Sequence, residues 1–248
     1  RVKARVVLKD EGAPEGLVLS SPSLRDYTFS RAPVDWETAR GVWRLLARWR
    51  CDPRWSWFGG ASDELACAWN RRAFKGDVAL DYFACPQMFA RGAPYYRHPG
   101  DFDSTICADG RDLSSGYSFL YGGWKGTRTA LFRRDEVVAE TREFLPPHTR
   151  DRNPPMMGPT GLHRRWFHLV LEKTGLPGGK ARIRGYVDGQ VACEYVDPEP
   201  LTGDRVGLWT FDGSAIFARV RVVSDGSSGP EPGLAGKPAP PPPEGMSA

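Results

Sequence analysis

The chain has 248 residues, of which 40% are hydrophobic and nine are Trp, so it can bury a sizeable core as one large domain or two small ones. Its 34 basic and 30 acidic residues are interleaved and leave a net charge of +4. This mixture excludes the basic stripe typical of nucleic-acid-binding surfaces. No apolar run reaches the ~20 residues of a membrane helix, so we expect neither a nucleic-acid partner nor membrane insertion.

The two ends of the sequence indicate a module of a longer protein. The chain opens on RVKARVVLKD, without the hydrophobic region of a signal peptide, and ends in GKPAPPPPEGMSA, a polyproline-type linker. We therefore expect further domains of the same polypeptide beyond residue 248. The Cys residues form an odd set without C-x-x-C spacing, which indicates neither a zinc site nor a redox motif and leaves one disulfide open: Cys51, Cys67, Cys85, Cys107 and Cys193.

Alternation of apolar and polar residues runs along most of the chain and predicts β-strands. In chain order the predicted strands are 5–9, 16–20, 26–31, 41–49, 64–70, 77–84, 104–109, 116–122, 127–134, 136–141, 164–173, 181–189, 190–197, 205–211 and 215–223. Asp188-Gly189 fits the type I′ turn of a hairpin. A proline-rich stretch over 144–164 is predicted to be a long loop.

About fifteen short strands without a reliable helix predict an all-β, two-sheet antiparallel jelly-roll sandwich. We place this β-sandwich domain at residues 1–225, with its core in 26–225. Gly, Ser and Pro dominate after Ser224, so residues 226–248 are predicted to be a linker or disordered tail.

The stretch RWRCDPRWSWFGG, residues 48–60, places four aromatic residues beside three arginines. We interpret it as two strand ends around the turn at Asp52-Pro53. Alternation then puts Trp55 and Trp57 on one face and Phe58 on the other. We expect one face of this stretch to pack in the core and the other to form an aromatic platform.

Several segments, taken in order, resemble the concanavalin A-like lectin/glucanase superfamily, and among its members the bacterial jelly-roll domains grouped with 3-keto-disaccharide hydrolases and laminin-G-like modules. They are WETARGVW, FKGDVALDYF, SGYSFLYGG, HRRWFHLVLEK, YVDGQVACEYVD, DRVGLWTF and IFARVRVV, and together they span roughly residues 26–225. Their order carries the resemblance. It implies a concanavalin A-like jelly roll, and it suggests activity on glycosides as one alternative.

Aromatic and polar residues on the predicted strands suit sugar binding, because pyranose rings stack on Trp and Tyr while polar neighbours fix the hydroxyls. In a jelly roll, alternate residues of one sheet face can line a groove. We predict that residues from the following set line one cleft on one sheet face: Trp69, Asp81, Tyr117, Arg133 and His168. The alternative for each aromatic residue is a place in the core.

Carboxylate pairs give little support for catalysis. The E-x-D-x-x-E strand of family-sixteen glucanases is absent. Asp77 and Asp81 share a face, but four residues of extended strand separate their backbones by ~13 Å, which is too far for an acid/base pair. Glu136 and Glu140 have the same spacing and are interpreted as a solvated hairpin edge.

Acidic residues cluster in DFDSTICADGRD, and hard carboxylate oxygens suit calcium, which many members of this superfamily bind. Asp101 and Asp103 are the candidate ligands. The EF-hand pattern fails because Ile106 stands where Gly is required. The alternative is that these Asp residues form turns.

Together these patterns favour a non-catalytic glycan-recognition module of a larger exported bacterial protein, extracytoplasmic (periplasmic or secreted), with a glycan or polysaccharide as its partner. Two alternatives stay open: a hydrolase or lyase that acts on glycosides through the same groove, and a structural module that mediates protein contacts. A groove with an acid and a base within ~10 Å would favour the enzyme. A flat apolar patch without a groove would favour the structural module.

Overall fold

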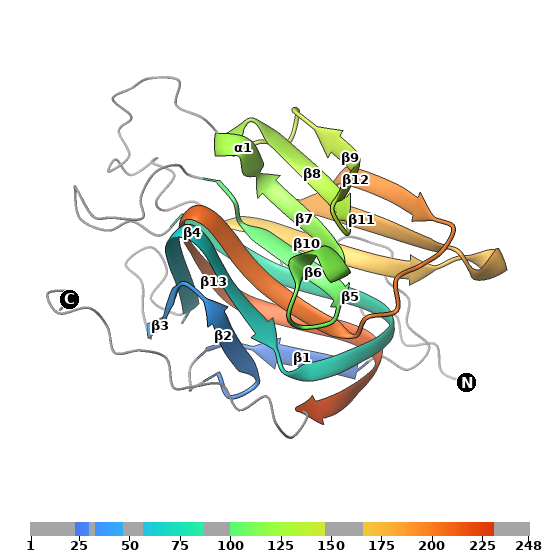
Figure 1. Cartoon of the computed structure of the whole chain (residues 1–248), viewed down its shortest axis with the longest axis horizontal. Helices are drawn as coiled ribbons and strands as arrows, with labels where there is room; N and C mark the ends of the chain where they lie inside the picture. Colours follow the sequence, from blue (N-terminus) through green and yellow to red (C-terminus); the bar gives the residue numbers. More distant parts are fainter. Residues whose placement is uncertain (1–22, 30–32, 47–56, 87–99, 147–165, 231–248) are drawn as a thin grey trace, which may run out of the picture.

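A computed structural model describes residues 23–29, 33–46, 57–86, 100–146 and 166–230 (Figure 1). The strands in these ranges are β1 Ser23–Tyr27, β2 Trp36–Arg40, β3 Val42–Leu46, β4 Trp57–Asn70, β5 Arg72–Pro86, β6 Asp103–Ala108, β7 Tyr117–Gly122, β8 Arg128–Arg133, β9 Glu136–Thr141, β10 Phe167–Gly175, β11 Ala181–Val187, β12 Gln190–Asp197 and β13 Arg205–Pro230. Helical structure in the described ranges is limited to α1 Gly123–Gly126 and two 3-10 turns, Leu113–Ser115 and Pro177–Gly179. None of these turns has the length and apolar character of a membrane span.

All strand pairs in the described ranges are antiparallel, and the long strand β13 connects the two halves of the molecule. Its first part, 205–218, pairs with β6 and β4, and its last part, 215–230, pairs with β5. The strand order along the main path is β12-β11-β10-β5-β13-β6-β7-β8-β9. In Figure 1 the orange ribbon of β13 runs alongside β4 and ends in the red arrow at the lower edge of the molecule. The predicted all-β antiparallel jelly-roll sandwich is confirmed.

Alternation along each strand decides which side chains enter the core, because successive side chains point to opposite sheet faces. In β5, Leu80 and Tyr82 are fully buried in the core, and in the adjacent strand β10 Phe167 and Leu169 are buried on the same face of the sheet. Tyr82 donates a hydrogen bond to the carbonyl of Phe102 at 2.9 Å, so its hydroxyl is satisfied inside the core. The outward faces remain available for a site.

Aromatic rings pack at the end of the sandwich where β4 begins. Phe58 is buried, with its ring centroid 4.6 Å from that of Trp43 and 5.4 Å from that of Phe29. Gly60 lies against Trp43, and a Cβ there would come within 2.7 Å of the indole ring. The prediction that one face of RWRCDPRWSWFGG enters the core is therefore confirmed at Phe58, whereas residues 47–56 and the side chain of Trp57 lie outside the described structure.

Strand boundaries differ from the predictions in several places. The sequence did not predict β2, and β4 and β5 begin several residues before the predicted strands 64–70 and 77–84. Residues 205–211 and 215–223 form one strand, because pairing with β4 continues through a register shift between Phe211 and Gly213. That strand runs on to Pro230, past the predicted boundary at residue 225, since Ser227 and Ser228 pair with Phe74 and Ala73. Polar residues can hold a strand edge once a partner strand supplies the hydrogen bonds.

Some sequence predictions fall on residues that are not described. The predicted strands 5–9 and 16–20, most of the loop at 144–164 and the tail beyond residue 230 are of this kind. Four of the five cysteines are described, all are buried, and no disulfide joins any two of them: Cys67, Cys85, Cys107 and Cys193.

Candidate functional site

Two adjoining hollows lie on the outward face of the sheet that contains β4, β6, β7, β8 and the first part of β13. Their volumes are about 400 Å³ and about 370 Å³, and both linings include Leu120 and Trp209. We call the two together the groove. The larger hollow, the arginine end, includes Arg40, Trp69, Arg111, Asp112, Arg134 and Asp135. The smaller one, the aspartate end, includes Asp101, Trp124, Lys125, Phe211 and Asp212.

The floor of the groove follows from strand alternation. In β7, Tyr117 and Phe119 point into the core, so Ser118 and Leu120 point outward into the groove. In β4, Ala68 is in the core, whereas Trp69 packs against Trp209 in a separate apolar cluster. Each strand therefore contributes an outward row of small and apolar side chains.

Hydrogen bonds fix the Trp209 ring in this floor. Its indole N–H donates to the hydroxyl of Thr105 at 3.0 Å, and Thr105 is in turn hydrogen-bonded to Ser118 at 2.7 Å. Gly207 lies against Trp69, where a Cβ would come within 2.8 Å of the ring. The two indoles are 4% and 8% exposed, so they shape the floor and offer little free ring surface.

Trp124 stands at the rim of the groove on a strained turn. Trp124 and Lys125 have φ values of 52° and 61°, in the left-handed region, between Gly122 and Gly126. This conformation costs a non-glycine residue roughly 1–2 kcal/mol, and such strain is concentrated at functional sites. The result is an indole that is 40% exposed, with the guanidinium of Arg128 3.9 Å from its ring centroid.

A second exposed ring lines the same end of the groove. Phe211 is 51% exposed, which is unusual for a phenylalanine in the middle of a long strand. The Trp124 ring is itself oriented by Phe132, whose ring lies nearly parallel to it at 5.9 Å. The aspartate end therefore presents two aromatic faces beside polar groups, which is the arrangement that sugar rings require.

Asp101, at the aspartate end, and its neighbour Asp103 have raised pKa values and so hold their protons more strongly than ordinary Asp residues. Burial, and then the neighbouring Asp212, raise the pKa of Asp101 to about 8. Asp103 is fully buried, and burial together with Asp101 raises its pKa well above the usual range. One of its oxygens accepts the backbone N–H of Tyr121 at 3.0 Å.

The predicted calcium ligands Asp101 and Asp103 lie near each other. Within the described ranges, no three His, Cys, Asp or Glu side chains are grouped so that they could hold a metal ion. The other acidic residues of the segment form turns: Asp109 accepts the N–H groups of Arg111 and Asp112, and Asp112 accepts that of Ser114. The turn-forming alternative accounts for Asp109 and Asp112.

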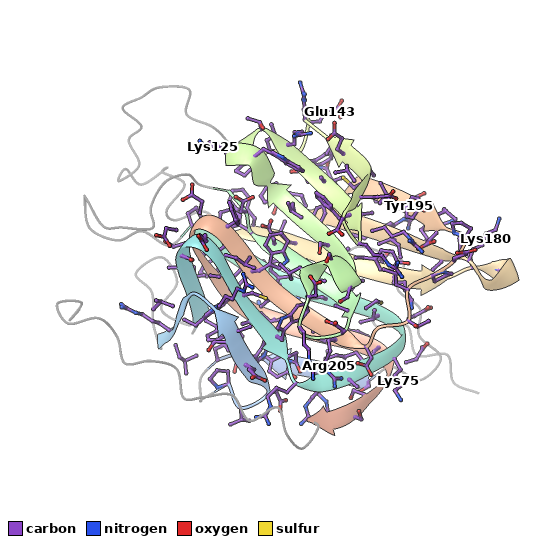
Figure 2. All side chains as sticks on the ribbon, in the orientation of Figure 1. Lys75, Lys125, Glu143, Lys180, Tyr195 and Arg205 are labelled. Atoms are coloured by element: carbon purple, nitrogen blue, oxygen red, sulfur yellow. The ribbon has the colours of Figure 1, made fainter. Side chains whose placement is uncertain are left out.

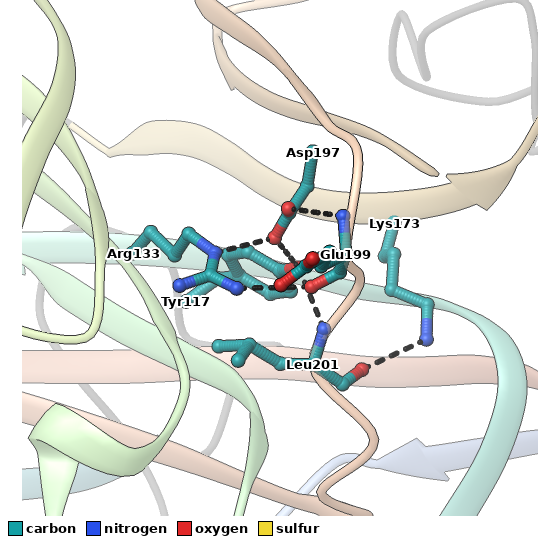
Figure 3. Close-up of polar contacts among 6 residues, drawn as sticks. All are labelled: Tyr117, Arg133, Lys173, Asp197, Glu199 and Leu201. Carbon is teal, nitrogen blue, oxygen red and sulfur yellow. Dashed lines mark hydrogen bonds and ion pairs between the residues drawn. The ribbon is translucent and has the colours of Figure 1, made fainter. Parts of the chain in front are cut away.

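Of the five predicted ligand-binding residues, the structure brings Trp69 to the groove. Tyr117 points to the other side of β7 and, with Arg133, holds the loop that follows β12 (Figure 3). The Tyr117 hydroxyl and Arg133 Nε contact one oxygen of Asp197 at 2.5 Å and 2.6 Å. Burial opposes ionisation of Asp197, but these two hydrogen bonds outweigh it and lower its pKa.

Asp81 and His168 lie on the outward face of the other half of the sandwich, on β5 and β10. His168 Nε2 is 3.2 Å from Asp81 Oδ1, and Arg221 contacts both oxygens of Asp81 at 3.1 and 3.3 Å. His168 also stacks on Phe83, with centroids 4.7 Å apart. The five residues therefore lie in three separate places and do not form one cleft.

The sequence prediction missed most of the groove, namely Arg40, Trp124, Arg134, Trp209 and Phe211. One signal was present in the sequence. GLWTF alternates so that Trp209 and Phe211 share a face, and neither was included in the predicted set. Trp124 carries no periodic signal because it lies in a turn.

No family model matches the chain, and no curated protein matches it. Solved structures do match. A protein of unknown function with a galectin-like fold from Bacillus subtilis aligns with a TM-score of 0.51 and 16% identity, covering 87% of this chain and 97% of that one. The carbohydrate binding module CBM66 from Bacillus subtilis aligns with a TM-score of 0.47 and 16% identity, covering 75% of this chain and 94% of that one. The carbohydrate recognition domain of Emp47p aligns with a TM-score of 0.49 and 11% identity, covering 85% of this chain and 100% of that one.

At these identities the likeness concerns the fold alone. The chain has a galectin-like jelly-roll fold, and a jelly roll is what the order of its sequence segments implied.

Proposed function

We propose that this domain is a glycan-recognition module that binds an oligosaccharide in the groove. The observation that carries the proposal is the aspartate end, where the exposed rings of Trp124 and Phe211 border a hollow of about 370 Å³ together with Asp101 and Asp212. Aromatic faces take up the C–H faces of pyranose rings, and carboxyl groups exchange hydrogen bonds with their hydroxyls. A floor fixed by Thr105 and Trp209 supplies a preformed surface.

Export from the cytoplasm and further domains on the same polypeptide are part of this proposal. The support is the ligand class itself, because polysaccharides are found mainly outside the cytoplasm, and the proline-rich sequence at 237–243.

A glycan array probed with the chain tests the proposal, run once with calcium and once with chelator. We expect a defined group of glycans to bind in both conditions, since no three His, Cys, Asp or Glu side chains of the described ranges are grouped as metal ligands. Binding to no glycan on the array would contradict the proposal. Loss of all binding in chelator would show that a metal completes the site.

An enzyme that acts on glycosides is the second candidate, and the raised pKa of Asp101 favours it. A carboxyl group that lines a sugar-sized hollow with a pKa of about 8 can hold a proton near neutral pH, as a general acid must. Incubation of the array hits with the chain and with an Asp101→Asn variant distinguishes the two functions. Cleavage by the natural chain, lost in the variant, would establish catalysis, and intact glycans would support recognition alone.

A further inference from the structure

Three arginines from separate segments converge on the arginine end of the groove. Arg40 is the last residue of β2, Arg111 lies in the loop after β6, and Arg134 lies in the turn after β8. All three side chains are exposed, so their guanidinium groups can reach a molecule in the groove. No regular pattern in the sequence brings these residues together, and only the fold does so.

Arg40 and Arg134 have no carboxylate partner within the described ranges, so their guanidinium groups remain available to a ligand. Elsewhere such pairs are short: Arg72 with Asp35, Arg133 with Asp197 and Arg184 with Glu194 are each 2.6 Å apart. Arg111 is attracted by Asp109, whose carboxylate also accepts hydrogen bonds from two backbone N–H groups. Asp112, in the same hollow, is engaged by the backbone and hydroxyl of Ser114.

Guanidinium groups bind carboxylate and sulfate groups in a planar, two-pronged geometry. We infer that the groove takes an anionic oligosaccharide, with its acidic group at Arg40 and Arg134 and a neutral ring between Trp124 and Phe211. This inference rests on the proposed function and adds the chemical class of the glycan and its direction in the groove.

The different net charge of the two ends sets that direction. At the aspartate end, the raised pKa of Asp101 keeps its proton in place near neutral pH, and the carboxylate of Asp212 is matched by the ammonium group of Lys125. An acidic sugar placed there would meet no excess of positive charge, whereas a neutral ring would meet hydrogen-bonding partners for its hydroxyls. At the arginine end, an acidic ligand would have to approach two carboxylates, Asp112 and Asp135, and the three guanidinium groups outnumber them.

The test is a glycan array with three matched arms on the same backbones: neutral, carboxylated and sulfated. We expect the carboxylated or the sulfated arm to bind at least 10-fold more strongly than the neutral arm, and the stronger arm identifies the acidic group. Equal binding of the neutral arm would overturn the inference and leave the proposed function standing. Binding to no arm would overturn both.

A charge-matched pair of variants then locates the interaction. Titration calorimetry with the best acidic glycan compares Arg40→Gln/Arg134→Gln with Lys75→Gln/Lys180→Gln, whose lysines are outside the groove lining (Figure 2). We expect at least a 10-fold loss of affinity in the arginine variant and less than a 2-fold loss in the lysine variant. Similar losses in both would mean that net charge alone attracts the glycan, and the inference would be wrong. Melting curves check that both variants fold.

Discussion

Two tryptophans of the groove illustrate how the same residue type serves either stability or contact with a ligand. Trp69 is 4% exposed and packs in an apolar cluster, whereas Trp124 is 40% exposed on a strained turn. Sequence alternation predicted that Trp69 lies on a sheet face, and it does. It could not predict exposure, which depends on the strands and loops that the fold brings alongside.

We predict losses of stability of very different size when these two rings are removed. Trp69→Ala should reduce the free energy of unfolding by about 3–5 kcal/mol, because it leaves a cavity under the groove. Trp124→Ala should cost less than about 1 kcal/mol, since its ring is already partly solvated. Chemical denaturation of both variants measures this. A large loss for Trp124→Ala would show that its ring belongs to the folded core.

Asp101 gives a prediction in pH. Its pKa of about 8 in the folded chain exceeds the ~3.9 of an unfolded Asp. Between these two pH values the folded state therefore holds a proton that the unfolded chain releases. The contribution of Asp101 to the free energy of unfolding is full below pH ~4 and is lost as the pH rises through its folded-state pKa of about 8.

Asp101→Asn should remove that dependence. We expect the variant to be at least about 1 kcal/mol more stable than the natural chain at pH 9 and close to it at pH 4, since one pKa unit corresponds to about 1.4 kcal/mol. Thermal melts across this range provide the measurement. An equal effect of the substitution at both pH values would mean that Asp101 titrates normally.

Among the single elements, β7 and β8 show why two residues predicted to line the cleft lie elsewhere in the structure. Tyr117 and Arg133 looked suited to a groove because they combine ring and charge on strands. In the fold they face β12 and hold its following loop through Asp197 and the carbonyl of Glu199. Alternation divides a strand into two faces, but only the packing of the second sheet decides which face is inside.

Arg133→Gln should therefore affect folding and leave glycan binding unchanged. Loss of a 2.6 Å ion pair to the buried Asp197 should cost about 1–3 kcal/mol. Denaturation and glycan titration of the same variant separate the two effects. If the variant had normal stability but bound the glycan more weakly, Arg133 would be a ligand-binding residue after all.

At the scale of the whole molecule, the sequence predicted the architecture better than the site. Period-two alternation and the Asp188-Gly189 hairpin follow from local chemistry, and both are present. The groove depends on register between distant segments, for example Gly207 opposite Trp69 and Trp209 opposite Asp103. Local pattern carries no information about such pairings, so Arg40 and Arg134 could not be placed together from the sequence.

The continuation of β13 to Pro230 gives a prediction for the domain boundary. A chain ending at residue 225 lacks the pairing of Ser227 and Ser228 with β5, whereas one ending at residue 230 keeps it. We expect the shorter chain to melt ~2–4 °C lower, which corresponds to about 1 kcal/mol at this size. Equal melting temperatures would support the predicted boundary at 225.

The central claim is that a glycan binds in the groove against the exposed Trp124 ring. The most direct test is titration calorimetry of the natural chain and of Trp124→Ala with the strongest glycan from the array. We expect Trp124→Ala to lose about 1–3 kcal/mol of binding free energy, roughly 5- to 150-fold in Kd, while its melting temperature stays close to that of the natural chain. The same Kd for both chains would contradict the claim and place the glycan elsewhere on the molecule.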